Sequence, residues 1–129
     1  MPGRTKSETG SAVVEFALVL PILFLVLLAV VQVGVLARDQ LLLTQAARAG
    51  AREAAVSLDD AAVREVAVGA APSLDPDRLQ LRVDRAGGLG SAVTVALGYE
   101  APIAVPIARW LLPQAVALRA TATMRQEVT

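Results

Sequence analysis

Hydrophobic side chains form one long run near the start of the chain. The run extends from Ala12 to Ala37. Four residues interrupt it: Glu15, Pro21, Gln32 and Gly34. A membrane-spanning helix needs roughly 20 mostly apolar residues, and Phe16–Ala37 supplies 22 of them. The pattern therefore predicts one transmembrane helix over residues 11–37.

The helical pattern continues beyond the apolar run without a helix-breaking residue. Residues 38–57 carry apolar and small side chains at helical spacing. The transmembrane segment and this extension together predict one helix of about 46 residues. A short second helix is expected over Leu58–Ala71, because Ser57 can cap its start, two aspartates occupy its first turn, and Pro72 stops it.

Small residues lie four positions apart in the predicted extension, at Ala46, Gly50 and Ala54. This spacing places them on one face of a helix, where another backbone can approach closely. Two interpretations stay open: the face packs on this chain's own sheet, or it contacts another subunit. Arg48 and Arg52 lie on a neighbouring face, and as like charges four residues apart they are better solvated than paired.

The remainder of the chain is typical of β-strands. Three segments alternate apolar with polar or small side chains: Leu79–Arg85, Ser91–Tyr99 and Ala115–Gln126. Ala86–Gly90 is a glycine-rich turn between the first two. The three prolines of residues 100–113 predict that this stretch joins no regular ladder.

Three such strands indicate a small antiparallel sheet with one covered face and one solvent-facing side. A sheet of this size must bury its apolar face against another element, and the helix extension is the available one. The predicted fold class is therefore α+β. A leader covers residues 1–10, a transmembrane helix residues 11–37, and a head residues 38–129, which includes the helix extension.

Composition narrows the candidate chemistry. The chain has no cysteine and no histidine, which excludes disulfides, thiol catalysis and a histidine-dependent triad. The acidic and basic residues of 38–129 cancel, so nothing indicates binding to nucleic acid. Asp59 and Asp60 are expected at a helix start, and Asp75 and Asp77 in a turn without the oxygen spacing of a calcium loop. We expect no enzymatic activity, no metal and no cofactor.

A carboxylate, Glu15, lies near the N-terminal end of the apolar run, where a charge is unfavourable. Gly10, five residues earlier, offers a peptide bond that a protease can approach closely. A cut after Gly10 would make Ser11 the new N-terminus, and on a helix its amine would share a face with Glu15. That amine could compensate the carboxylate within one chain or between neighbouring chains. Alternatively, Glu15 only reaches to the headgroups at the membrane boundary.

A resemblance adds to this interpretation. The stretch GSAVVEFALVLPILFLVLL resembles the N-terminus of the TadE-like family, pseudopilins of tight-adherence (Flp) pilus systems. The family's type IV prepilin-like pattern is a short basic leader, a glycine, four residues, a glutamate, an aromatic residue and the transmembrane segment. Gly10, Glu15 and Phe16 match it. Gln45–Ala55 and Leu118–Glu127 are similar to the helix extension and the last strand of the family.

The resemblance implies a minor pilin or assembly factor rather than an enzyme. A prepilin peptidase of the inner membrane would cut between Gly10 and Ser11. Glu15, with Phe16 beside it, would then help dock the subunit against other pilins or the pilus assembly platform. The head would lie outside the cytoplasm, whereas the arginines and the lysine that flank the apolar run do not decide the orientation.

Two other processing outcomes remain possible from the residues alone. In the first, the leader is not cut, and the chain is a single-pass, membrane-anchored accessory protein. In the second, signal peptidase cuts after Ala37, at the small-residue sequence Val35–Ala37, and releases a soluble domain.

Trp110, the only tryptophan, lies in a short apolar cluster with Ile107, Leu111 and Leu112. We expect this cluster to cap the sheet as ordinary core. Contact with a membrane surface or a partner pilin is the alternative.

Overall fold

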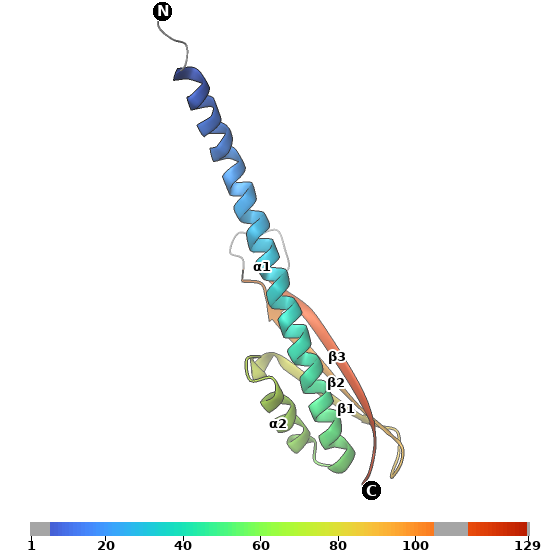
Figure 1. The fold of residues 1–129 in the computed structure, drawn as a ribbon. Helices are drawn as coiled ribbons and strands as arrows, with labels where there is room; N and C mark the ends of the chain where they lie inside the picture. The colour runs from blue at the N-terminus through green and yellow to red at the C-terminus, as the bar shows by residue number, and fades with distance from the viewer. Residues whose placement is uncertain (1–5, 105–113, 129) are drawn as a thin grey trace, which may run out of the picture. The chain divides into compact units, whose positions relative to one another are not determined.

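The computed structural model describes residues 6–104 and 114–128, and the side chains from residue 10 onward. In chain order the elements are α1 (Lys6–Val56), α2 (Asp60–Ala70), a 3₁₀ turn (Pro76–Arg78), β1 (Leu79–Arg85), β2 (Ala92–Pro102) and β3 (Ala115–Arg125) (Figure 1). The chain divides into two compact units, Met1–Gly34 and Val35–Thr129, called here the N-terminal and C-terminal units. The α+β architecture predicted from the sequence is confirmed.

Helix α1 is a single element of 51 residues that contributes to both units. It includes Pro21, which lies inside the helix without ending it. The helix begins at Lys6, so Gly10 lies within it rather than before it. The predicted continuation of the apolar helix is correct, and its end at Val56 is one residue short of the predicted boundary.

Helix α2 begins later than the sequence predicts. Asp59, not Ser57, is its N-cap, and the Asp59 carboxylate accepts a hydrogen bond of 2.9 Å from the backbone N–H of Ala61. The Ser57 hydroxyl instead accepts from the N–H of Asp59, at 3.2 Å. An aspartate satisfies the free backbone donors of a helix start at least as well as a serine. The helix therefore starts after Asp59, whose carboxylate reaches a free backbone N–H of the first turn.

The three strands form one antiparallel sheet in the order β1-β2-β3. Gly98, at the centre of β2, lies opposite Gln80 of β1 and Arg119 of β3. The prediction that residues 100–113 join no ladder is wrong at its start, because Glu100–Pro102 pair with Ala115–Ala117. Pro102 is the last residue of β2, a place where a strand tolerates a missing N–H donor.

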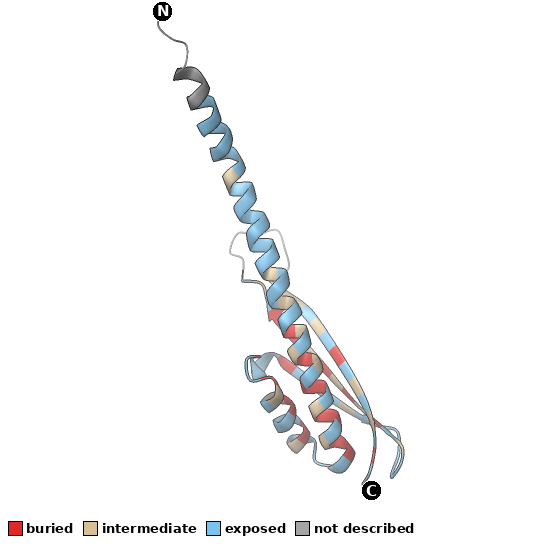
Figure 2. Cartoon of the chain, viewed as in Figure 1, coloured by how far each residue is buried: buried red, intermediate tan, exposed pale blue. Residues whose placement is uncertain are grey.

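The core of the C-terminal unit lies between the sheet and the two helices. Figure 2 shows the buried residues of α1 on the side that meets α2 and the strands. The fully buried side chains come from α1, α2 and β2: Leu43, Ala46, Ala47, Ala51, Ala54, Val63, Ala67, Val93, Val95 and Ala101. Alanines dominate the α1 contribution, so the helix backbone can lie close to the sheet. The predicted apolar face of β2 is confirmed, with Val93, Val95, Leu97 and Tyr99 all buried.

Polar contacts hold the ends of this core in place. The guanidinium of Arg85 donates to the carboxylate of Asp60 at 2.7 Å and to the carbonyl oxygen of Ser57 at 3.3 Å, which ties β1 to the connection between the helices. The N–H of Glu127 donates to the carbonyl oxygen of Ala55 at 2.7 Å. That bond satisfies one of the unpaired carbonyls in the last turn of α1.

Gly50 generates a prediction about packing. A Cβ at this position would lie 3.4 Å from Ala67 Cβ and 3.4 Å from Val95 Cγ1, so α2 and β2 both approach the helix backbone there. Gly50→Leu should overpack the contact and lower the free energy of unfolding by roughly 1–3 kcal/mol. Thermal unfolding of the full chain in detergent, followed by circular dichroism, measures the effect.

Gly69→Leu is the matched control, because a Cβ at Gly69 meets nothing within 4 Å. Both substitutions replace a helical glycine by a better helix former, which favours the variant by up to about 1 kcal/mol. The control should therefore unfold at the wild-type temperature or slightly above it. Equal melting temperatures for the two variants would show that the Gly50 contact is not tight.

Candidate functional site

Within the part of the chain that the structure describes, the apolar half of α1 is largely uncovered. Nearly all of its large hydrophobic side chains are exposed, from Val13 at 65% to Val33 at 65%. The helix is long and apolar enough to cross a membrane, and its most apolar window is not buried at all. An exposed apolar surface of this extent is unfavourable in water. The segment therefore needs a lipid or protein environment that this chain does not provide.

The four residues predicted for processing and assembly lie at the start of this segment. Gly10, Ser11, Glu15 and Phe16 are all on α1 and all exposed. A Cβ added at Gly10 would meet nothing within 4 Å, so no other part of the described chain crowds this peptide bond. Ser11 and Glu15 are one helical turn apart and share a side of α1.

Glu15 has no hydrogen bond or ion pair within residues 6–104 and 114–128. Its side chain is exposed at the boundary of the uncovered apolar segment. A carboxylate can enter an apolar environment only with a compensating donor or cation. The described residues supply no such partner, whereas the solvent, a headgroup, a new N-terminus or another chain could.

The small residues of α1 occupy a different place. Ala46, Gly50 and Ala54 are buried in the C-terminal unit, and the Gly50 position contacts Val63 and Val95 of the same chain. Of the two interpretations that the sequence left open, the structure shows the packing within this chain. In this folded state the three residues present no free face to another subunit.

The described residues contain no constellation for catalysis or metal binding. None of their acidic side chains gathers in a group of three or more that could hold a metal ion. Asp59 caps α2, Asp60 pairs with Arg85, and Asp75 caps the 3₁₀ turn and pairs with Arg78 at 3.4 Å. The aspartates thus have structural roles, as the sequence predicts.

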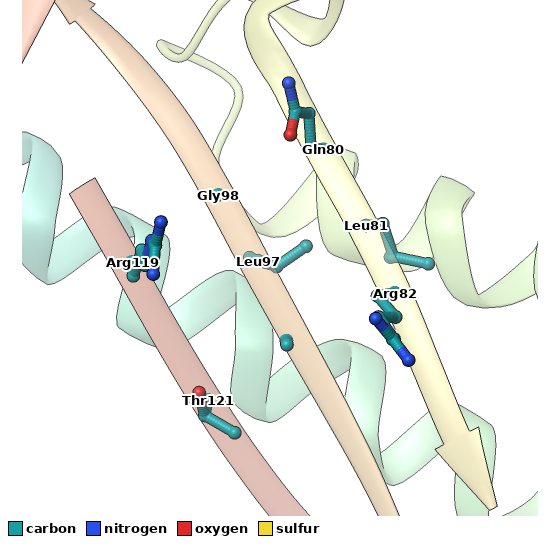
Figure 3. A pocket seen from close by; sticks show the side chains of 8 residues that line it. Gln80, Leu81, Arg82, Leu97, Gly98, Arg119 and Thr121 are labelled. Atoms are coloured by element: carbon teal, nitrogen blue, oxygen red, sulfur yellow. The ribbon is translucent and has the colours of Figure 1, made fainter. Parts of the chain in front are cut away.

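A shallow hollow of about 470 Å³ lies on the outer face of the sheet (Figure 3). Its floor is formed by the small residues Ala96 and Gly98 of β2, and longer side chains of the two neighbouring strands stand around it, among them Arg82 and Arg119. Arg82 is paired with Asp84 at 3.2 Å. The hollow contains no carboxylate and no nucleophile beyond the hydroxyl of Thr121. It offers polar contacts but no acid–base pair.

Sequence reasoning did not identify this hollow or the ion pair between Arg85 and Asp60. Both depend on strand register and on the placement of α2, which alternation along single strands does not determine. The apolar cluster around Trp110, with Ile107, Leu111 and Leu112, lies outside the described residues.

Residues 10–52 match the family model described as TadE-like protein. The match covers about a third of the chain and contains Gly10, Ser11, Glu15 and Phe16. Of the small residues of α1 it contains Ala46 and Gly50 but not Ala54. It confirms the resemblance seen in the sequence. Comparison with curated proteins and with solved structures gives no match.

The exposed apolar segment generates a prediction about membrane attachment. Leu23→Arg together with Leu27→Arg places two charges near the centre of the segment, each unfavourable for insertion by roughly 2.5–3.5 kcal/mol. Most of the protein should leave the membrane fraction, as measured by alkaline extraction and immunoblotting.

The control is Leu41→Arg with Leu89→Arg, because both of these leucines are 66% exposed in the C-terminal unit. That variant should stay in the membrane fraction. If the two double variants partitioned alike, the segment around Leu23 would not be the anchor.

Proposed function

We propose that this chain is a non-enzymatic pseudopilin, a minor pilin of a tight-adherence type IVb pilus, in view of the TadE-like match over residues 10–52. A prepilin peptidase cuts its leader after Gly10, and the protein then acts in pilus assembly or surface adhesion. The coarser part of this assignment, a pilus-related role with one membrane-spanning helix, follows from the family match and the uncovered apolar helix.

One observation carries the proposal. Gly10, Glu15 and Phe16 lie at the N-terminal end of an apolar helical segment whose side chains are largely exposed. The family match starts at Gly10. Nothing in the described fold uses Gly10 or Glu15. Residues without a role in folding, at the boundary of a membrane segment, are best explained by contacts with other molecules.

Cleavage requires access to the peptide bond between Gly10 and Ser11. This bond lies inside α1, so the helix must open locally before a peptidase can bind it. A glycine lowers that cost, since it favours the helix by roughly 0.5–1 kcal/mol less than alanine does. The absence of a Cβ at Gly10 also leaves the carbonyl carbon open to attack from either side.

The cut would create the partner that Glu15 lacks. The new α-amine at Ser11 is mostly protonated at neutral pH and lies one turn from Glu15 on the same side of the helix. It can neutralise the carboxylate of its own chain or of a neighbour. Inside an assembly, the intermolecular pair would fix the depth at which one α1 helix docks beside the next.

The proposed location is the inner membrane. Residues 11–37 span it once, with the short N-terminus in the cytoplasm and residues 38–129 outside. The partners are the prepilin peptidase, other pilins or pseudopilins, and the pilus assembly platform. The protein needs no cofactor in this role.

A second candidate is an uncleaved single-pass anchor for the same C-terminal unit. It is favoured by the continuity of α1 across Gly10 and Ser11, because a helical peptide bond resists proteolysis. In that protein Glu15 would face the headgroups and have no partner amine. Release of a soluble domain after Ala37 would instead cut α1 inside its helical run.

Substitution of Gly10 tests the processing step. Gly10→Leu should block removal of the leader, because its side chain occupies the approach to the peptide bond. The variant should run on a gel as the unprocessed chain in its native host. Gly34→Leu is the matched control, since a Cβ at Gly34 also meets nothing within 4 Å. Processing of the Gly10 variant at the wild-type rate would contradict the proposed cleavage.

Substitution of Glu15 tests the docking step. Glu15→Ala should leave membrane insertion and leader removal intact, but reduce assembled pili by about tenfold, which corresponds to the loss of about 1.4 kcal/mol of contact. Glu15→Asp keeps the charge and should retain most of the assembly. Shear-released pili are measured by immunoblotting. A normal yield from Glu15→Ala would assign the carboxylate no part in assembly.

A further inference from the structure

One exposed side of α1 in the C-terminal unit carries cations without partners. Arg48 and Arg52 are exposed, and neither makes an ion pair or side-chain hydrogen bond to the part of the chain that the structure describes. Like charges four residues apart disfavour a helix. The folding of a single chain therefore gives no reason for this pair of arginines.

An exposed carboxylate without a partner lies on α2. Glu65 has no ion pair among the described residues. Its neighbour Arg64 does not neutralise it, because the Arg64 guanidinium donates to the carbonyl oxygens of Pro76 at 3.1 Å and Leu79 at 3.4 Å. Glu65 is thus free to receive a cation from outside the chain.

The arginine pair and Glu65 lie at the same level along α1. Gly50 is midway between Arg48 and Arg52, about 3 Å along the axis from each. A Cβ at Gly50 would lie 3.4 Å from Ala67 Cβ and 3.6 Å from Val63 Cγ1. Glu65 is midway between these two residues of α2.

The two charged groups lie on opposite sides of the C-terminal unit. Residues two positions apart on a helix point in nearly opposite directions, because each residue turns the helix by about 100°. Arg48 and Arg52 therefore point away from the contact at Gly50, and Glu65 points away from the contact at Val63 and Ala67.

We propose that copies of this chain, anchored side by side, associate through this complementarity: Arg48 and Arg52 of one copy bind Glu65 of the next. The proposal rests on the proposed membrane anchoring. Because the arginine pair and Glu65 lie at the same level of the C-terminal unit, two such units standing side by side bring the groups together. The contact joins two different surfaces, so it forms an open row rather than a closed pair.

Lipid headgroups are a poorer match for the two arginines. Arg48 and Arg52 lie 10 and 14 residues beyond Arg38, about 15 and 21 Å along the helix. The polar layer on one side of a bilayer is only about 5–8 Å deep. Single exposed ion pairs contribute little affinity, but confinement in one membrane raises the effective concentration. The pairs then set the spacing and direction of the row.

Cross-linking of the full chain in membranes tests the contact. The chain has no cysteine, so introduced thiols are the only ones present. Copies carrying Arg52→Cys are expressed together with copies carrying Glu65→Cys. A short bismaleimide then links the two thiols across the distance that the arginine and glutamate side chains spanned. We expect at least about fivefold more dimer than from Arg52→Cys with Asp84→Cys, a matched exposed acid on the outer face of the sheet.

Charge reversal tests the chemistry of the contact. The double variant Arg48→Glu, Arg52→Glu and the single variant Glu65→Arg should each reduce co-purification of two differently tagged copies by about fivefold. The triple variant restores complementarity and should recover most of it. Loss with the double variant alone, and not with Glu65→Arg, would assign the arginines to another anionic partner and overturn the proposal.

Two readouts on the same samples separate this inference from the proposed function. Alkaline extraction reports anchoring, and the N-terminal residue reports leader removal. An anchored, processed chain without the cross-link between positions 52 and 65 would overturn the lateral contact alone. If the main cross-link joined position 52 of one copy to position 52 of another, the contact would be a symmetric pair, and the proposed row would be wrong. If the chain were not anchored in the membrane, both the lateral contact and the proposed function would be wrong.

Discussion

The close packing of α1 on β2 and α2 at Gly50 is the interaction on which the C-terminal unit depends. The apolar face of the three-stranded sheet must be covered by another layer, and α2 has only 11 residues. The alanine-rich side of α1 supplies the missing half of the core. Because the helix is long, the element that completes this core also extends into the uncovered apolar segment. Helix α1 therefore packs in a protein core over one part of its length and carries exposed apolar side chains over another.

This division explains where function is located. Side chains of the C-terminal unit bond to one another and to its backbone, for example Arg85 to Asp60 and to the carbonyl oxygen of Ser57. Glu15, in contrast, has no hydrogen bond or ion pair within residues 6–104 and 114–128, and most of the large apolar side chains of residues 13–33 are exposed. The proposed role in assembly would use this arrangement, because other molecules would then cover the exposed apolar side chains of α1.

Local patterns in the sequence predicted most of the fold. Alternation identified β1 at its observed bounds, Leu79–Arg85, because a half-buried strand imposes its period on adjacent residues. The errors arose where two local signals compete, as at the start of α2, where Asp59 displaced Ser57 as the cap. A further error arose at Pro102, which pairs with Ala115 although a proline is unfavourable in a regular β-ladder. The partners of Gly50 could not be predicted, since a small face fits equally well against its own sheet or another helix. The candidate site stays a prediction, which the sequence alone can offer because Gly10, Ser11, Glu15 and Phe16 lie within seven residues of one helix.

The N-terminal residue of the mature protein tests the central claim most directly. Intact mass and N-terminal sequencing would be measured on protein recovered from membranes of its native host. The account predicts a chain that begins at Ser11, with the new amine one turn from Glu15. A chain that keeps Met1 or Pro2, or one that begins at Arg38, would contradict it: the first would be a plain anchor, and the second would have lost Glu15 altogether.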